Sequence, residues 1–592
     1  MRKWLLASLV AYGFAALALA GPSAVVTVDP LHPPRQLDYL IVAPAALQDA
    51  CRPLAEYHAS QGLAVGMADA GAVYAALGSG KPEPEAVRDL VQALAARAGL
   101  KYLLLAGTAD PANPLCVPAW RLKARFYTED YPCDEEMVGD ALYACPAGDL
   151  APNLAVGRLP ARSAGQLRTM VAKTLACHRA AQGGPWMFRV ELLAGQAFFG
   201  PAMDLLLEQL FAAVVNQTVP THVDLHVTYA NADSAYCPAP GRMVAHILRQ
   251  FEAGPAALIF AGHGDYDRLA RMECSGRRYE LLDAPAAARL SNPDHRTAVF
   301  VIACRTGCID GPQPCLGEAL LANKQGPAAF FGASRISQPY ANAVLVSTLS
   351  ETLFARTAPG SVGQFVLQLR QDMLGNHPNS LRAMLDLPAM TQLGMSALAQ
   401  QREDAALEYV LLADPALPLR VALCGAQVSA PPECPAGEGV TVTVMCPQAP
   451  SAQVTVLLAM RRNQTATEGA AAGNSLDEAA MNRRQEAANR KTIAQTRGQL
   501  VDGVARVRLA IPAALAAGEY GIGAVICTGG QAVGGSTSIR VVASEAAIPA
   551  EPAPMAGDEA APPTPAANPA SPARPTPRSP APAKPARAAK FD

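Results

Sequence analysis

The chain has 592 residues, with 48 basic and 50 acidic side chains and a formal net charge of -2. This length exceeds what one hydrophobic core usually supports, so we expect several domains. The balanced charge gives no general attraction to nucleic acid or to an anionic membrane, and we expect no nucleic-acid partner. A functional site must therefore be found from local patterns.

The first twenty residues are typical of a secretory signal peptide. Arg2 and Lys3 precede an apolar stretch that ends in Ala18-Leu19-Ala20, a cleavage pattern of small residues. No later segment offers the ~18 uncharged apolar residues that a membrane-spanning helix needs. We predict a signal peptide over 1–20, no transmembrane segment, and a bacterial-type protein that is secreted, periplasmic or on the cell surface.

Fourteen cysteines would then lie in an oxidising compartment, where disulfides form. Spacing alone leaves the pairing open. The candidate pairs are Cys446 with Cys527, Cys424 with Cys434, and Cys308 with Cys315.

Residues 36–182 are predicted to form an α/β unit. Apolar strands alternate with amphipathic helices, which is typical of a parallel sheet covered on both faces. A stretch rich in Pro, Cys and acidic residues at 109–152 interrupts the alternation. The expected strands are 38–43, 63–68, 101–107 and 153–160, and the expected helices are near 46–61, 82–98 and 163–180.

A second α/β unit is predicted over 185–423. It repeats the alternation of apolar strands and helices, so a second parallel sheet is expected. The expected strands are 188–195, 221–229, 256–261, 297–303 and 327–332, and the expected helices are near 202–215, 240–252 and 284–290.

The remaining chain changes composition twice. Val/Thr-rich alternating strands over 425–545 indicate an immunoglobulin-like β-sandwich. A polar helical insert is expected at 463–500, where Ser475-Leu476-Asp477-Glu478 matches a capping box. Residues 546–592 are Pro/Ala-rich and are predicted to be disordered. Their basic tip offers a contact with an anionic cell envelope, although a solvated tail is favoured.

Two apolar strands end in chemically active residues. The strand at 256–261 is followed by Gly262-His263-Gly264, and the strand at 297–303 is followed by Cys304. Ligands bind beyond the carboxyl ends of strands in open parallel sheets. If the two strands are neighbours, roughly 5 Å apart, an imidazole and a thiol come within working range. The sequence therefore predicts a Cys/His dyad.

The residue types fit acyl transfer. A thiol is a strong nucleophile as the thiolate, and an imidazole can take its proton and return it to a leaving amine. Gly264 has no Cβ, so its N–H can approach a substrate carbonyl closely. With the amide of Cys304 it would form an oxyanion hole. Gly262 is expected to leave room for the imidazole.

The same segments resemble the gingipain family of cysteine peptidases, family C25 of the caspase-like clan. The matching text is AALIFAGHG at 256–264, AVFVIACRTG at 298–307 and CLGEALLANKQGPAAFFGASRIS at 315–337. The resemblance extends over about 38–421 and implies a caspase-like catalytic domain in two α/β parts, followed by a β-sandwich.

The resemblance implies a role for each matched residue. Cys304 would be the nucleophile, His263 the general base and acid, and the amides of Gly264 and Cys304 the oxyanion donors, with proteins or peptides as substrates. Asn153 stands where the family usually has an acidic residue, so an amide is the candidate for orienting the histidine. Residues 161–166 lack the acidic side chain expected of arginine-specific members.

The chemistry requires no cofactor, but one metal is considered. Calcium prefers oxygen ligands, and gingipains bind calcium, so an acidic run in the interrupting stretch is a weak candidate for a structural calcium site. An exposed acidic loop without metal is the favoured interpretation. The candidate ligands are Asp130, Asp134 and Asp140.

The sequence thus predicts a secreted cysteine endopeptidase that works through a thioester acyl-enzyme. Two alternatives are kept open. One is a sortase-like transpeptidase, in which an amine takes the acyl group instead of water. The other is a catalytically weak envelope or adhesive protein that retains the fold, which the amide of Asn153 favours.

Overall fold

The computed structural model describes most of the chain between residues 24 and 543. The described residues are 24–129, 132–180, 183–198, 200–292, 297–355, 359–375, 380–464 and 477–543. The predicted signal peptide, the predicted disordered tail, Asp130 and Ser475 lie outside them.

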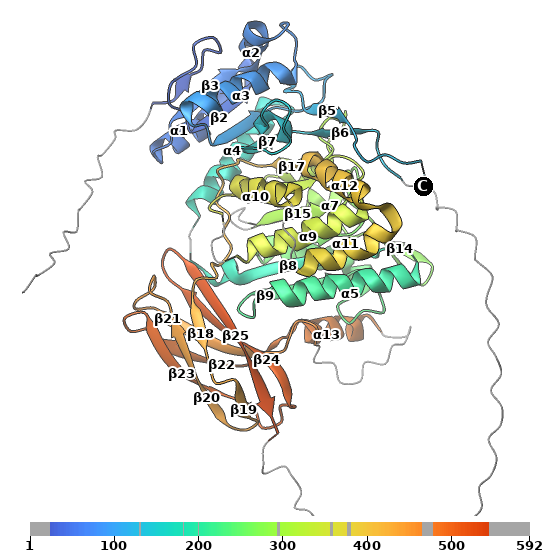
Figure 1. The fold of residues 1–592 in the computed structure, drawn as a ribbon, viewed down its shortest axis with the longest axis vertical. Helices are drawn as coiled ribbons and strands as arrows, with labels where there is room; N and C mark the ends of the chain where they lie inside the picture. The colour runs from blue at the N-terminus through green and yellow to red at the C-terminus, as the bar shows by residue number, and fades with distance from the viewer. Residues whose placement is uncertain are drawn as a thin grey trace, which may run out of the picture. The chain divides into compact units, whose positions relative to one another are not determined.

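The first α/β unit contains a five-stranded parallel sheet in the order β1-β3-β2-β4-β7 (Figure 1). Successive side chains of a strand point to opposite faces. Tyr39 and Ile41 accordingly pack toward α1 and α4, whereas Leu40 and Val42 pack toward α2 and α3. The elements are β1 Val26–Thr27, β2 Tyr39–Ala43, β3 Val65–Asp69, β4 Tyr102–Ala106, β7 Ala155–Leu159, α1 Gln48–Ser60, α2 Ala70–Leu77, α3 Pro84–Ala98 and α4 Ala164–Arg179.

The stretch that interrupts this unit is not a plain loop. Strands β5 (Trp120–Lys123) and β6 (Glu136–Gly139) form an antiparallel hairpin. The hairpin carries Asp134 toward the second α/β unit, as described below.

The second unit contains a six-stranded sheet in the order β17-β16-β15-β10-β8-β9. Its neighbours run parallel except β17, which pairs antiparallel with β16. Helices cover both faces: α6, α7 and α8 pack on one, and α5, α9, α10 and α12 on the other (Figure 1). The strands are β8 Arg189–Ala194, β9 Asp224–Tyr229, β10 Ala257–Ala261, β15 Ala298–Ile302, β16 Ala329–Ala333 and β17 Tyr409–Leu412.

The helices of this unit include the expected crossover helix and an unexpected run near its end. The crossover between β10 and β15 also contains two small hairpins, which the sequence did not predict. The helices are α5 Pro201–Thr218, α6 Met243–Glu252, α7 Ala284–Ala287, α8 Leu316–Ala322, α9 Pro339–Leu353, α10 Val362–Leu374, α11 Ser380–Leu393 and α12 Met395–Glu408, and the hairpin strands are β11 Gly264–Asp265, β12 Arg268–Leu269, β13 Met272–Cys274 and β14 Arg277–Tyr279.

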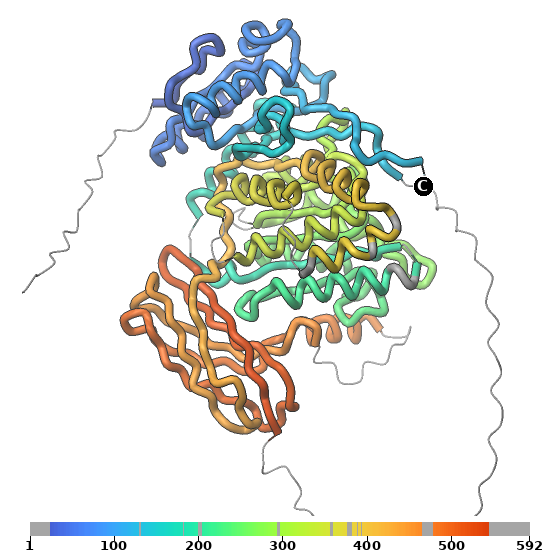
Figure 2. The backbone as a smooth tube through the Cα atoms, in the orientation of Figure 1, coloured from blue at the N-terminus to red at the C-terminus, as the bar shows by residue number. Residues whose placement is uncertain are grey.

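The chain then passes from β17 through residues 413–425 into a β-sandwich (Figure 2). A three-stranded sheet, β18-β20-β23, and a five-stranded sheet, β19-β25-β24-β21-β22, enclose one apolar core. The immunoglobulin type of this sandwich stays a prediction. The strands are β18 Gln427–Ser429, β19 Glu433–Pro435, β20 Gly439–Met445, β21 Gln453–Ala459, β22 Thr492–Gln499, β23 Val504–Ala510, β24 Gly518–Cys527 and β25 Ala532–Val542.

The polar insert is shorter than expected. Its helix, α13, spans Glu478–Asn489, and Thr492–Gln499 belongs to the sandwich as β22. Asp477 caps the helix by accepting from the N–H of Ala480, so the cap is Asp477 and not Ser475. The side-chain oxygen of Asn489 accepts from the N–H of Val227 at 2.7 Å, which joins the insert to β9.

The predicted disulfides are wrong. All fourteen cysteines lie in the described residues and carry free thiols. Cys308 contacts Asp310 and Arg335 instead, and Cys315 is buried where it begins α8.

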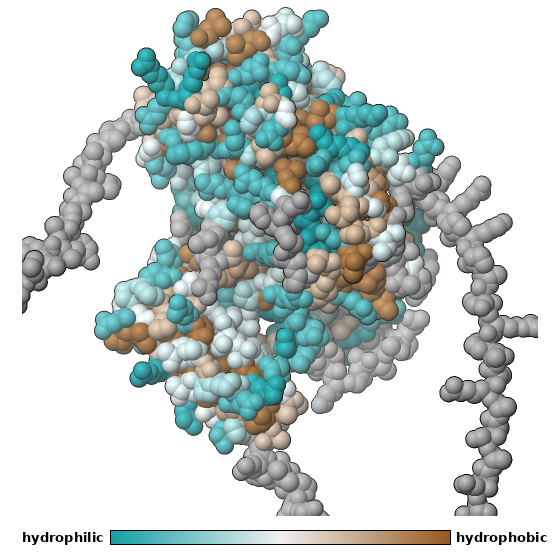
Figure 3. All heavy atoms as spheres, in the orientation of Figure 1, coloured by the Kyte–Doolittle hydropathy of each residue, from teal (hydrophilic) through white to brown (hydrophobic). Residues whose placement is uncertain are grey.

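Among the described residues, no helix is long and apolar enough to cross a membrane. The face drawn in Figure 3 is mostly hydrophilic, with apolar side chains in scattered groups.

Candidate active site

The two strands that end in His263 and Cys304 are neighbours. β10 and β15 pair in parallel with Ala261 opposite Ile302, so each active residue follows its strand by two positions. The predicted pairing of these strands is confirmed. Because parallel strands end at the same edge, both residues lie at the carboxyl edge of the six-stranded sheet.

The imidazole of His263 is held by the loop after the adjacent strand β8. Its Nε2 lies 2.5 Å from the carbonyl oxygen of Ala197. A carbonyl only accepts, so Nε2 carries the hydrogen and Nδ1 is the nitrogen that can take a proton. The ring of Phe198 lies 6.2 Å away, centroid to centroid.

Asn153 is not placed to orient this imidazole. It precedes β7 in the five-stranded sheet, at the amino end of the strand, and is exposed. Its own N–H donates to the carbonyl of Ala144 at 2.9 Å. His263 Nε2 donates to the backbone carbonyl of Ala197. Because the acceptor is a backbone atom, its residue type gives no signal in the sequence.

Cys304 is half-buried beside a serine that the sequence did not single out. Its Sγ lies 3.7 Å from the carbonyl oxygen and 3.8 Å from the Oγ of Ser337. Burial raises the pKa of the Cys304 thiol, the contacts with Ser337 lower it, and the carboxyl of Glu408 raises it again. The net pKa is raised, so the thiol needs a base to become a nucleophile.

Ser337 is itself fixed from behind. The side-chain amide of Asn342 donates to Ser337 Oγ at 2.8 Å, and the hydroxyl of Tyr409 donates to Asn342 Oδ1 at 2.8 Å. Asn342 and Tyr409 thereby fix the position of the Ser337 hydroxyl beside the sulfur of Cys304.

The residue after the thiol makes a sharp turn. Arg305 has φ of +58°, in the left-handed region that non-glycine residues rarely adopt. Its N–H donates to the carbonyl of Arg335 at 3.0 Å, and its guanidinium donates to Asp134 Oδ1 at 2.8 Å. The other oxygen of Asp134 accepts from the N–H of Ile336 at 2.8 Å. Asp134 thus holds both the residue that follows the thiol and the segment that carries Ser337.

The glycines around His263 are needed for close backbone approach. A Cβ on Gly264 would lie 2.9 Å from the carbonyl oxygen of Cys304 and 2.9 Å from Ala303 Cβ. A Cβ on Gly262 would lie 3.1 Å from the Cα of Gly195. Gly262 therefore makes room for the segment after the neighbouring strand β8, and its role in leaving room for the imidazole stays a prediction.

Arg162, at the end of the five-stranded sheet, clamps the loop after the thiol. Its guanidinium donates to the carbonyl of Gly311 at 2.8 Å and to Asp110 at 3.2 Å, and it pairs with Glu318 at 3.3 Å. Glu318 in turn accepts from the N–H of Cys315 at 2.9 Å. The first sheet thereby supports the active edge of the second.

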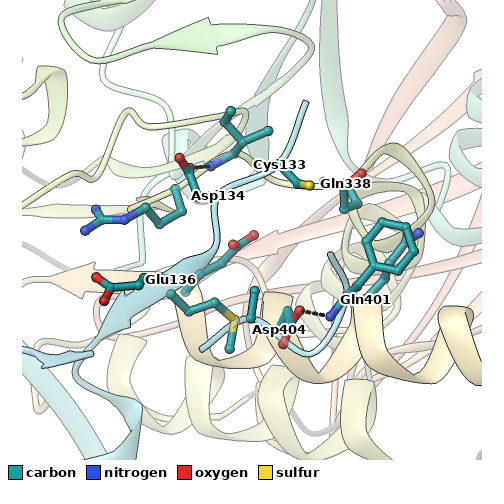
Figure 4. Close-up of a pocket in the computed structure, with 12 residues that line it drawn as sticks. Cys133, Asp134, Glu136, Gln338, Gln401 and Asp404 are labelled. Atoms are coloured by element: carbon teal, nitrogen blue, oxygen red, sulfur yellow. Dashed lines mark hydrogen bonds between the residues drawn. The ribbon is translucent and has the colours of Figure 1, made fainter. Parts of the chain in front are cut away.

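A narrow acidic pocket lies beside the segment that carries Ser337 (Figure 4). Ile336 and Gln338, on either side of Ser337, line it together with four carboxyl-bearing residues and Arg335. Burial, with Asp404 and Asp134 nearby, raises the pKa of Glu408 well above its usual range. The buried Oε1 of Gln401 has no hydrogen-bond partner among the described residues. The carboxyl-bearing residues are Asp134, Glu136, Asp404 and Glu408.

The sequence model of peptidase family C25 matches residues 32–420. The chain belongs to peptidase family C25. It is a cysteine-type peptidase with proteins or peptides as substrates, which confirms the family resemblance and the enzyme class.

Solved structures give further likenesses. Gingipain R, described as an Arg-specific cysteine proteinase, is 14% identical, with 87% of this chain and all of that chain covered at a TM-score of 0.48. A structure described as a protease is 17% identical over 85% of this chain and 97% of its own, also at 0.48. The pro- and mature domains of Porphyromonas gingivalis RgpB match at 14% identity over 85% and 100%, at 0.43. A comparison with curated proteins gives no match.

Two of the three candidate calcium ligands, Asp134 and Asp140, lie in the described part of this C25 peptidase and bind protein groups. Asp140 is buried and accepts two hydrogen bonds from the fully buried Arg158, at 2.8 and 2.7 Å. Asp134 binds Arg305 and Ile336 as described. Each of these carboxylates therefore has a structural partner, and calcium at this place stays a prediction.

Proposed function

We propose that the chain is an exported endopeptidase in which Cys304 is the nucleophile and His263 the general base and acid. The observation that carries the proposal is the parallel register of β10 and β15, which ends both strands at one level of one edge. The 2.5 Å contact between His263 Nε2 and Ala197 O supports it, because it turns Nδ1 into the basic nitrogen.

The reaction then follows with groups of the chain. Nδ1 of His263 takes the proton of the Cys304 thiol, and the sulfur attacks the carbonyl carbon of the scissile peptide. The amides of Gly264 and Cys304 hold the oxyanion. The C–N bond breaks, the amine leaves with the proton from His263, and a thioester remains. Water, deprotonated by the same imidazole, then releases the acid and restores the thiol.

The acidic pocket is proposed to receive a cationic substrate side chain. Its carboxyl-bearing residues come from the β5–β6 hairpin and α12, and Arg335 is bound at 2.8 Å to Asp310. The raised pKa of Glu408 favours its neutral form, and Asp134 is already paired with Arg305. Glu136 and Asp404 would therefore attract the cation and repel an anionic side chain. This subsite differs from the place at 161–166, since Arg162 already binds the loop after the thiol.

We place the enzyme outside the cytoplasm because residues 1–20 have the pattern of a signal peptide. The β-sandwich is proposed to be of immunoglobulin type, as its short alternating strands suggest. The basic Pro/Ala-rich tail over 546–592 is proposed as a contact with the cell envelope.

A peptide library tests the proposal. The wild-type chain should cleave library peptides, Cys304→Ala should not, and Cys274→Ser, which removes another half-buried thiol, should keep the activity. Full activity in Cys304→Ala would refute the assigned nucleophile. Cleavage preferentially beside Asp or Glu would refute the pocket assignment and leave the dyad standing.

A further inference from the structure

A second constellation of reactive side chains lies away from the proposed dyad. His58 Nε2 and His178 Nε2 each lie 2.9 Å from Asp414 Oδ2. These ligand atoms all lie within 4.8 Å of one another. His58 comes from α1, His178 from the last turn of α4, and Asp414 follows β17. Two helices of the first unit therefore meet the end of the second sheet here.

The carboxyl group of this cluster is a buried anion. Asp414 is 0% exposed, and its Oδ1 accepts from the hydroxyl of Tyr39 at 2.7 Å and from the N–H of Ala416 at 3.0 Å. A buried carboxylate needs a balancing positive charge. The groups facing its Oδ2 are the two imidazoles.

We propose that His58, His178 and Asp414 bind a divalent cation of the zinc type through both Nε2 atoms and Oδ2. Imidazole nitrogen and carboxylate oxygen are zinc ligands, and three protein ligands with water in the fourth position is a known arrangement. Around a tetrahedral ion with bonds of about 2.0–2.1 Å, ligand atoms are separated by roughly 3.3 Å. To reach that spacing, each 2.9 Å nitrogen–oxygen separation would open by a few tenths of an ångström, and the two imidazole nitrogens, which lie within 4.8 Å of each other, would adjust toward it.

The surroundings favour such an ion over a chance meeting of side chains. Tyr39 and Ala416 fix the second carboxylate oxygen, which keeps Oδ2 turned to the imidazoles, as outer hydrogen bonds do in metal sites. The rings of His58 and His178 meet edge to face with centroids 5.1 Å apart, and Tyr39 packs 4.5 Å from His58. The bound ion would pin α1 and α4 to the segment after β17 and so stabilise the joint between the two units.

The test uses the full chain carrying Cys304→Ala, so that zinc does not bind at the proposed dyad. Glutamine is chosen to replace each histidine, because its amide can still donate a hydrogen bond to Asp414 but does not ligate zinc. His226→Gln, in the half-buried His226–Asp224 pair at 3.3 Å, is the matched control. Zinc content is measured after dialysis, melting temperature with and without added zinc, and the absorption spectrum with Co²⁺.

The expected result is one equivalent of zinc and a melting temperature raised by several degrees. Both should be lost in His58→Gln and His178→Gln and kept in His226→Gln. Cobalt should give tetrahedral d–d bands without a thiolate charge-transfer band. Zinc absent from the parent protein, zinc retained in both glutamine variants, or a thiolate band with cobalt would each overturn the proposal, and none of these results bears on the dyad.

Discussion

The two parallel sheets are built alike and differ at their carboxyl edges. In the five-stranded sheet, Arg158 of β7 is fully buried and binds Asp140 and the carbonyl of Gly107 at 3.0 Å. In the six-stranded sheet, Cys304 is half-buried, and its sulfur makes long contacts of 3.7 and 3.8 Å with Ser337. The same strand architecture thus carries a buried ion pair at the carboxyl edge of one sheet, called the closed edge, and the candidate active site at that of the other, called the reactive edge.

Residues of the first unit also contact the segments that surround Cys304 at the reactive edge. Arg162 follows β7 and reaches Gly311 and Glu318, beyond the thiol in the chain. Asp134, from the hairpin of the first unit, binds Arg305, which follows the thiol, and Ile336, which precedes Ser337. The first unit is therefore a support for the site and not only a neighbouring domain.

The reactive edge should tolerate no added side chain at Gly264. In Gly264→Ala the new methyl group would meet the carbonyl oxygen of Cys304, so the proposed oxyanion amides would shift. We expect kcat to fall roughly 10²- to 10³-fold, the cost typical of a lost oxyanion donor. Steady-state kinetics measure it. Gly165→Ala, on α4 beside the closed edge, is the control, and equal activity of both variants would contradict the assigned approach.

Breaking the support between the edges should cost stability. Arg162→Met leaves Glu318, with 3% side-chain exposure, without its cation, so we expect a loss of about 3 kcal/mol in the free energy of unfolding. Urea unfolding measures this loss. Arg278→Met removes an exposed ion pair with Glu273 and should change it by less than about 1 kcal/mol. Similar effects for the two variants would show that Arg162 is not a clamp.

Acid should weaken the six-stranded sheet near β9, away from the dyad. Burial lowers the pKa of His222 to about 4 and that of His246 to about 4. Because the unfolded chain binds these protons first, stability is complete above about pH 6.5 and is lost as the pH falls toward 4. Each histidine contributes up to about 3 kcal/mol, at about 1.4 kcal/mol per pKa unit.

Unfolding curves between pH 4 and 7 measure this loss. His246→Gln should flatten the dependence, whereas His32→Gln, which changes an exposed histidine, should leave it unchanged. A pH dependence that is the same in His246→Gln and in the wild type would contradict the assigned cause. The measurement also separates acid unfolding from titration of the dyad.

The smallest effect is expected at Asn153. It is exposed at the amino end of β7, so Asn153→Ala should change activity and stability by less than about 0.5 kcal/mol. Peptide cleavage and thermal unfolding check this. A large drop in kcat with unchanged stability would return Asn153 to the role of orienting His263 and would weaken the distinction between the two edges.

The sequence was sufficient for the two strands that precede His263 and Cys304. Continuous apolar runs separated by helical patterns predict buried parallel strands, and the active residues at their ends predict the edge. The pairing of β10 with β15 confirms this. The prediction succeeded because each strand is marked by a continuous apolar run and the segment between them is long enough for a crossover.

The supporting contacts could not be read in the same way. Asp134 meets Arg305 across 171 positions, and Ser337 lies in a loop without periodicity, so neither has a local signal. Ala197 acts through its carbonyl, for which residue type carries no information. The disulfide predictions failed because the number and compartment of cysteines say nothing about their separation in the fold.

Alkylation of Cys304 followed by mass spectrometry tests the central claim most directly. The folded wild-type chain should be labelled at Cys304 before the other half-buried cysteines, because His263 removes its proton. His263→Ala should slow that labelling at least roughly tenfold while the rates at Cys274 and Cys308 stay unchanged. Equal rates at Cys304 in the two proteins would contradict the account of a Cys304–His263 dyad.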